Sequence, residues 1–205
     1  MNLADQPDKG TGFDVAVIGA GVVGAALARA FTLDGARVVV LEKAVDVLDG
    51  ASKGNSAILH TGFDAPEASV ELACIREGYA LYHDIRDRLG LPLIQAGALV
   101  LAWTEEEAAG LPALVAQATA NGVTDVQPLT GPQARVLEPA LSPAVRAGFR
   151  VPGEHLIDPW SAAHGYLLQA LANGAVLKRR TEVLAGRRSG DRWHLATTSG
   201  EVSAS

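Results

Sequence analysis

Cysteine and long apolar runs are scarce in this sequence. Cys74 is the only cysteine among 205 residues, which excludes an internal disulfide and a cysteine-rich metal site. The longest uncharged, mostly apolar stretch, residues 15–28, is too short and too rich in glycine and alanine to span a bilayer. The first 13 residues are polar and lack the apolar core of a secretory signal. We therefore expect a soluble, cytoplasmic protein with no integral membrane segment and no metal site.

Basic side chains are also in the minority. The chain has 17 Lys and Arg against 23 Asp and Glu, a formal net charge of −6. This balance argues against nucleic-acid binding, which needs a basic face. Apolar residues make up 48% and charged residues 20%, so the composition is that of a globular protein and excludes a disordered chain.

The first part of the chain predicts a βαβ unit. Residues 13–18 and 37–42 are compact apolar runs typical of buried strands, and residues 22–34 form a helical pattern that ends at Gly35. Two such strands joined by a helix are expected to be parallel and buried on both faces. Residues 43–66 show no sustained period, and a loop of this length inside a compact domain is usually functional.

The remainder of the chain alternates helical and strand patterns, which predicts an α/β nucleotide-binding core with an inserted α+β region. A Thr104–Glu107 capping box starts one helix, and Asp158 before Pro159 is the expected N-cap of another. Helices are expected over residues 66–89, 105–121, a short stretch near 132, and 160–172. Strands are expected over residues 96–103, 125–129, 144–151, 175–178, 183–188, 192–197 and from 201 onward.

A glycine motif joins the first strand to the first helix. Gly19, Gly21 and Gly24 form G-x-G-x-x-G, with Val22 and Val23 in the variable positions, between an expected strand and an expected helix. The first glycine allows the tight turn, the second lets a pyrophosphate approach the helix N-terminus, and the third lets helix and strand pack closely.

An acidic residue ends the second strand. Glu42 follows Gly24 by 18 residues and precedes Lys43. A carboxylate at this place can accept hydrogen bonds from a ribose and disfavours a 2′-phosphate. The alternative, in which the glycines serve packing alone and Glu42 is a solvated strand end, has less support because strand, helix, spacing and acid all agree. The motif predicts an adenine dinucleotide site, and by itself it does not separate FAD from NAD.

A second informative segment, residues 51–64, follows the βαβ unit. It combines small hydrogen-bonding residues with glycine, which suits close approach of the backbone to a ligand. Histidine is the side chain that titrates near neutrality, so His60 is a candidate general base. A lone histidine is also often structural, and composition leaves both roles open.

Three stretches carry a family resemblance: V-I-G-A-G-V-V-G at 17–24, L-E-K at 41–43, and S-K-G-N-S-A-I-L-H-T-G-F-D at 52–64. They resemble the D-amino-acid-oxidase-type FAD-dependent oxidoreductases. Within these, the sequence is most similar to the branch of flavin-dependent glycerol-3-phosphate dehydrogenases and oxidases and L-2-hydroxyglutarate dehydrogenases. Softer matches lie at 97–102, 138–139, 151–152 and 157–159.

The resemblance implies an FAD enzyme that oxidises the secondary alcohol of a small acidic substrate by hydride transfer to the flavin. Glycerol 3-phosphate is the favoured substrate and L-2-hydroxyglutarate the alternative, while the electron acceptor stays open. The resemblance also implies that His60 stands near the flavin and acts as the base on the substrate hydroxyl. Ser52, Lys53, Asn55 and Ser56 match the loop that holds the flavin and the pyrophosphate end, although Lys53 fits a solvated loop lysine equally well.

The resemblance implies a domain division as well. We expect a disordered tail at 1–12, an FAD-binding unit with the flavin loop and a helix at 13–90, part of a substrate domain at 91–158, and a return to the Rossmann-like FAD domain at 159–205. Family members continue beyond this point, so we expect an N-terminal half with weak FAD binding and little activity alone. An inactive dinucleotide-binding fragment is a second hypothesis. An NAD-dependent dehydrogenase is a third, and the G-N-S-x-x-x-H loop speaks against it.

Overall fold

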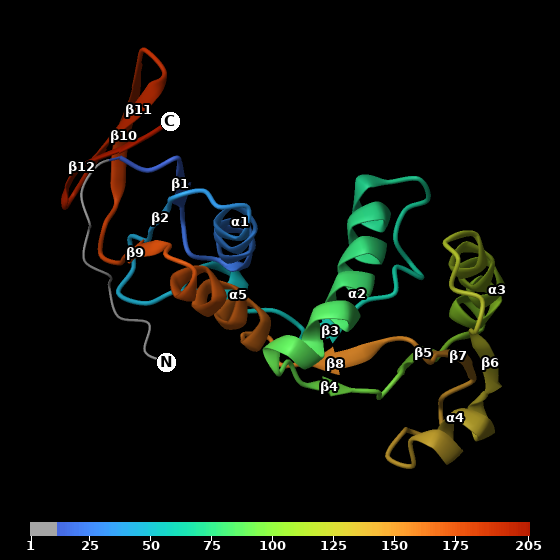
Figure 1. Ribbon diagram of the computed structural model, residues 1–205. Helices are drawn as coiled ribbons and strands as arrows, with labels where there is room; N and C mark the ends of the chain where they lie inside the picture. The colour runs from blue at the N-terminus through green and yellow to red at the C-terminus, as the bar shows by residue number, and fades with distance from the viewer. Residues whose placement is uncertain (1–11) are drawn as a thin grey trace. The chain divides into compact units, whose positions relative to one another are not determined.

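The computed structural model describes residues 12–205 and divides them between two compact units (Figure 1). Among the described residues, the first unit comprises 12–56 together with Pro159–Ser205, and the second is Ala57–Asp158. The expected tail at 1–12 lies outside the described residues except for Gly12. The expected grouping of residues 57–90 with the FAD-binding unit differs from this division. These residues belong to the second unit because β3 (Ile58–Leu59) pairs with β8 (His155–Ile157).

A parallel sheet forms the centre of the first unit. Strands β1 (Val15–Ile18), β2 (Val38–Leu41) and β9 (Val176–Lys178) pair in the order β1-β2-β9, with all neighbours parallel. Every residue of β2 is buried, as expected for the central strand of a covered parallel sheet. The βαβ unit predicted from the sequence is therefore present, with helix α1 (Val22–Leu33) as its crossover.

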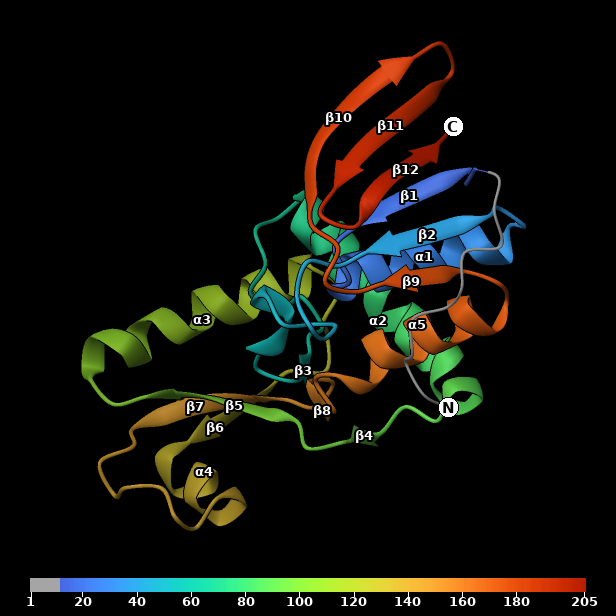
Figure 2. The same ribbon diagram turned by 90° about the vertical axis from the view of Figure 1, so that its left-hand side faces the viewer.

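The two faces of β2 pack against different elements. Val38 and Val40 share a core with Ala28 of α1 and with Leu167 of helix α5 (Ser161–Ala172). Side chains alternate across a strand, so the intervening residues of β2 face the other way. They pack against a second sheet of three antiparallel strands, β10 (Val183–Ser189), β11 (Arg192–Thr197) and β12 (Gly200–Ala204). Figure 2 shows the helices and the antiparallel sheet on opposite sides of β2.

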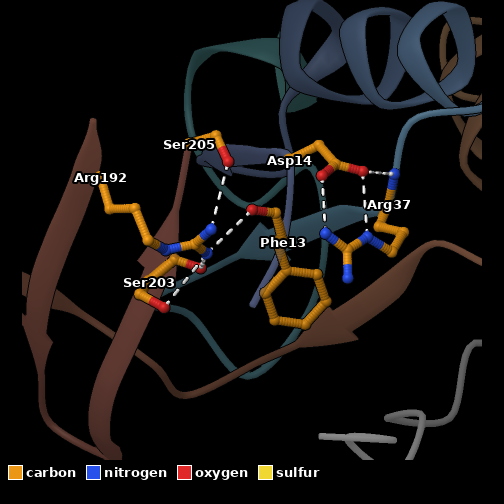
Figure 3. A network of polar contacts seen from close by, with 6 residues as sticks. All are labelled: Phe13, Asp14, Arg37, Arg192, Ser203 and Ser205. Atoms are coloured by element: carbon orange, nitrogen blue, oxygen red, sulfur yellow. Dashed lines mark hydrogen bonds and ion pairs between the residues drawn. The ribbon is translucent and has the colours of Figure 1, made fainter. Parts of the chain in front are cut away.

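Polar contacts connect the residues before β1 to β11 and β12, and also to the residue before β2 (Figure 3). The Arg192 guanidinium donates to the Phe13 carbonyl oxygen (3.2 Å) and to the Ser203 hydroxyl (3.3 Å). The Asp14 carboxylate accepts from the Arg37 guanidinium (2.7 Å) and from the Arg37 N–H (2.8 Å). These hydrogen bonds from Arg37 lower the pKa of Asp14 to about 2. The first unit is thus closed by contacts between segments far apart in the sequence.

The second unit holds two antiparallel sheets of three strands. One has the order β3-β8-β4, with β4 at Leu93–Ile94. The other has the order β5-β7-β6, with β5 at Ala98–Ala102, β7 at Ala147–Val151 and β6 at Gln127–Thr130. Its helices are α2 (Val70–Leu89), α3 (Glu105–Ala120) and α4 (Gly131–Leu137). Buried Phe149 and Val151 of β7 pack with Ala118 of α3.

Two helix starts differ from the expected ones. Helix α2 begins at Val70 rather than at Pro66, because the Ser69 hydroxyl accepts from the Leu72 N–H (3.0 Å) and acts as N-cap. Helix α5 begins at Ser161 with Trp160 in the N-cap position, two residues after Asp158, the expected N-cap. The capping box that starts α3 is confirmed, with Thr104 and Glu107 each bonded to the backbone of the other.

The short strands were not predicted. The expected loop at 43–66 contains a 3₁₀ turn at Ala51–Lys53 and the two-residue strand β3. Strands β4 and β8 have two and three residues and lay outside the expected strands. Such segments are too short to show an alternating pattern in the sequence. In the part of the chain from residue 12 onward, the helices fall short of the length and apolarity that crossing a membrane requires.

Candidate functional site

The turn between β1 and α1 requires glycine at two of its three motif positions. Gly19 has φ +97°, a backbone conformation that L side chains rarely adopt. A Cβ atom at Gly24 would collide with the carbonyl oxygen of Gly19 and lie 3.3 Å from Cγ1 of Val17. The first and third glycines therefore allow the tight turn and the close packing of α1 on β1 that the motif predicts.

The middle glycine leaves the first backbone donors of α1 without a side-chain cap. Gly21 is the N-cap residue and has no side chain to cap the N–H groups of Val23 and Gly24. The N–H of Val22 donates to Oγ of Ser52 (3.0 Å), and a Cβ at Gly21 would lie 3.1 Å from that oxygen. Val22 and Val23 are exposed here. The helix N-terminus thus keeps the donors and the dipole that favour an anion.

Glu42 is buried at the end of β2 and braces the same turn. Only 9% of its surface is exposed, which excludes the alternative of a solvated strand end. Its carboxylate accepts from the N–H groups of Ala20 (2.7 Å) and Ala44 (2.8 Å). An ionised carboxylate has about four acceptor sites, so capacity remains for the hydroxyls of a ribose.

A cavity of about 510 Å³ opens beside the turn and the end of β2. Its volume lies within the range of small-molecule sites, roughly 300–1,000 Å³. It is lined by five of the residues predicted to bind the cofactor: Gly19, Gly21, Glu42, Lys43 and Ser52. The glycine turn and the carboxylate of Glu42 meet at this cavity, an arrangement that fits the phosphate and ribose groups of an adenine dinucleotide.

Three further predicted residues of the loop lie outside the lining of this cavity. Lys53 is 69% exposed and pairs with Asp49 at 3.0 Å, which agrees with its interpretation as a solvated lysine. Asn55 donates from Nδ2 to the carbonyl oxygen of Ser52 (3.2 Å) and so helps to shape the loop. Ser56 is exposed at the end of the first unit.

His60 belongs to the second unit, where it pairs with a buried carboxylate. Its Nδ1 atom lies 3.1 Å from Oε2 of Glu154. The imidazole is 46% exposed, whereas the Glu154 side chain is 3% exposed. The strand register explains the contact: Leu59 of β3 lies opposite His155 of β8, so the residues next to them meet at the end of the pair.

Glu154 is the residue of this site that the sequence did not indicate. It follows a Pro-Gly turn, where an acidic residue usually faces solvent. In the structure, Oε1 of Glu154 accepts from the Thr61 N–H (2.6 Å) and from the Thr61 hydroxyl (2.7 Å). Tyr79 of α2 holds the preceding turn by donating to the Gly153 carbonyl oxygen (3.0 Å), and burial raises the pKa of this phenol. Glu154 can be recognised as a neighbour of His60 only once the pairing of β3 with β8 is known.

Because Glu42 accepts two backbone N–H groups and also lines the cavity, we expect Glu42→Ala to lower both stability and FAD affinity. This change leaves two N–H groups beside β2 without their acceptor, at a cost of about 1–3 kcal/mol for each buried group. Thermal melting with and without FAD measures both effects. The control is Glu182→Ala, which removes an exposed carboxylate at the same cavity. Equal melting temperatures for the two variants would contradict the bracing role.

Comparison with known proteins gives one family and several solved relatives. The family model described as FAD dependent oxidoreductase (DAO) matches residues 14–205. The glycerol 3-phosphate dehydrogenase of Caloramator mitchellensis is 30% identical over 172 residues, which cover 84% of this chain and 36% of that protein.

Two solved structures share the fold closely. L-α-glycerophosphate oxidase from Mycoplasma pneumoniae, reduced by dithionite and with FAD bound, has a TM-score of 0.87 and 28% identity, over 92% of this chain and 50% of that chain. Glycine oxidase from Geobacillus kaustophilus has a TM-score of 0.82 and 31% identity, over 94% and 53% of the two chains. The chain thus spans about half of each solved relative and about a third of the curated dehydrogenase.

Proposed function

Because the chain belongs to the FAD dependent oxidoreductase (DAO) family, we propose that it binds FAD and oxidises the secondary alcohol of glycerol 3-phosphate. The choice of substrate is supported by the glycerol 3-phosphate relatives. The catalytic role is carried by one observation, the contact between half-exposed His60 and buried Glu154. The proposal includes a cytoplasmic location, which the single cysteine favours.

The main residues proposed to hold FAD lie at the glycine turn or line the cavity beside it. The uncapped N–H groups behind Gly21 would bind the pyrophosphate, and Glu42 would accept from the ribose hydroxyls. Ser52 would contact the phosphate at the same turn. We propose that further contacts with FAD are made by these residues: Gly19, Val22, Val23, Gly24, Lys43, Lys53, Asn55 and Ser56.

In the proposed reaction, His60 takes the hydroxyl proton of the substrate. The O–H bond breaks toward Nε2 of His60, and the alcohol carbon becomes a ketone as its hydride leaves. The imidazolium formed would be stabilised by the Glu154 carboxylate, 3.1 Å from Nδ1. Bound FAD supplies the hydride acceptor. A positioned base of this kind contributes roughly 10²–10⁴ in rate.

Turnover of a substrate panel tests the function. We expect FAD-loaded protein, with an artificial electron acceptor, to oxidise glycerol 3-phosphate faster than L-2-hydroxyglutarate or glycine. L-2-hydroxyglutarate tests the second hydroxy acid, and glycine tests the reaction named for the glycine oxidase relative. Fastest turnover of glycine would contradict alcohol oxidation. Bound FAD without turnover of any of the three would favour a non-catalytic dinucleotide-binding protein.

A further inference from the structure

We propose that Glu154 is a positioning residue, whose buried carboxylate holds His60 with its proton on Nδ1 and keeps Nε2 available as the base. This role rests on the proposed function, in which His60 takes the proton of the substrate. It concerns an acid that the sequence motifs do not contain.

The two oxygens of Glu154 are divided between two neighbours. Oε1 accepts both the N–H (2.6 Å) and the hydroxyl (2.7 Å) of Thr61, and Oε2 lies 3.1 Å from Nδ1 of His60. The side chain is 3% exposed, so these donors replace the water that an ionised carboxylate would otherwise bind. The carboxylate is held from one side by Thr61 and presents its other oxygen to the imidazole.

The place of this carboxylate favours one ring nitrogen of His60 as the carrier of the proton. An ionised carboxylate only accepts hydrogen bonds, so Oε2, 3.1 Å from Nδ1, favours a proton on Nδ1 over a lone pair there. A neutral imidazole has one N–H, and with the proton on Nδ1 the lone pair lies on Nε2. Histidine side chains in water favour the opposite tautomer, with the proton on Nε2. The proposed tautomer is therefore a specific consequence of Glu154.

We expect the contact between Glu154 and His60 to affect the imidazole more than the stability of the fold. Thr61 already ties Glu154 to the end of β3 through two hydrogen bonds, and the β3–β8 register holds the same segments together. A glutamine at position 154 keeps an oxygen for Thr61 and turns an NH₂ group toward Nδ1 of His60. Nδ1 must then accept, and the proton moves to Nε2, where it blocks the base.

The tautomer can be read directly by ¹⁵N NMR of histidine-labelled full chain, above the pH at which the imidazoles are protonated. We expect Nδ1 of His60 to give the N–H type of shift and Nε2 the lone-pair type, and Glu154→Gln to exchange the two. His60→Gln assigns the signals among the five histidines by removing one set. Glu105→Gln is the matched control, because it neutralises an exposed carboxylate paired with Arg146 in the same unit.

Turnover of FAD-loaded protein supplies the second measurement. We expect Glu154→Gln to lower kcat by roughly 10²–10⁴-fold, the range for loss of a positioned base, with KM for glycerol 3-phosphate little changed. Glu105→Gln should leave both constants as in the wild type. A fall in melting temperature with unchanged kcat would mark Glu154 as merely structural.

The outcomes separate this role from the proposed function. Full turnover by His60→Gln would overturn the proposed role of His60 as the base. The tautomer of His60 in the wild-type protein would still test whether Glu154 holds the imidazole. A wild-type His60 with its proton on Nε2 would overturn the positioning role, whether or not any variant folds. Unchanged His60 shifts in a folded Glu154→Gln would overturn it as well.

Discussion

A Gly21→Val variant is expected to lose FAD. A Cβ atom added at Gly21 would lie 3.1 Å from Oγ of Ser52, and we expect a valine there to cover the N–H groups at the start of α1. Those donors are the ones proposed to bind the pyrophosphate. Charge-assisted hydrogen bonds are worth about 1.5–3 kcal/mol each, so losing two of them weakens binding by at least about 10²-fold. The measurement is FAD per protein after purification, followed by titration with FAD.

The control for this variant is Ala30→Val, which adds similar bulk to an exposed position of the same helix, away from the turn. It should retain the wild-type FAD content. Melting temperatures of both variants show whether the first unit still folds. Wild-type FAD content in Gly21→Val would contradict the assignment of the glycine turn as the pyrophosphate site.

Replacing His60 with glutamine is expected to leave FAD content unchanged and to lower kcat by roughly 10²–10⁴-fold. The glutamine amide can still donate a hydrogen bond to Glu154, so the end of the β3–β8 pair keeps its contact. It cannot take a proton from the substrate at neutral pH. FAD content and dye-linked turnover of glycerol 3-phosphate measure the two parts of this expectation.

The matched control is His194→Gln. His194 also contacts a carboxylate through Nδ1, with Glu201 at 2.8 Å, but it lies on the antiparallel sheet of the first unit. Its replacement should leave kcat near the wild-type value. Near-full turnover by His60→Gln would return His60 to a structural role.

Features that depend on neighbouring residues could be predicted from the sequence. The glycine spacing predicted the turn at Gly19 and the crossover helix, and the hydroxyl and acid three residues apart predicted the cap of α3. The resemblance to FAD-dependent oxidoreductases, and with it the α/β fold class, is confirmed by the family match and the solved relatives. Local steric and hydrogen-bonding requirements leave a pattern within a few residues, and such patterns can be read without a structure.

Features that depend on pairing between distant segments could not be predicted. Glu154 meets His60 because two strands of two and three residues pair across nearly a hundred positions, and neither strand has a recognisable period. The same pair assigns residues 57–90 to the second unit. The buried state of Glu42 was also hidden, since its partners are backbone N–H groups brought near by the glycine turn.

Anaerobic reduction of the bound flavin tests the central claim most directly. FAD-loaded protein is mixed without oxygen with glycerol 3-phosphate that carries either hydrogen or deuterium on C2, and the visible absorbance of oxidised flavin is followed. Hydride transfer from the alcohol carbon predicts that the absorbance bleaches, and that it bleaches more slowly with deuterium. A flavin that binds fully and stays oxidised in the presence of glycerol 3-phosphate would contradict the claim.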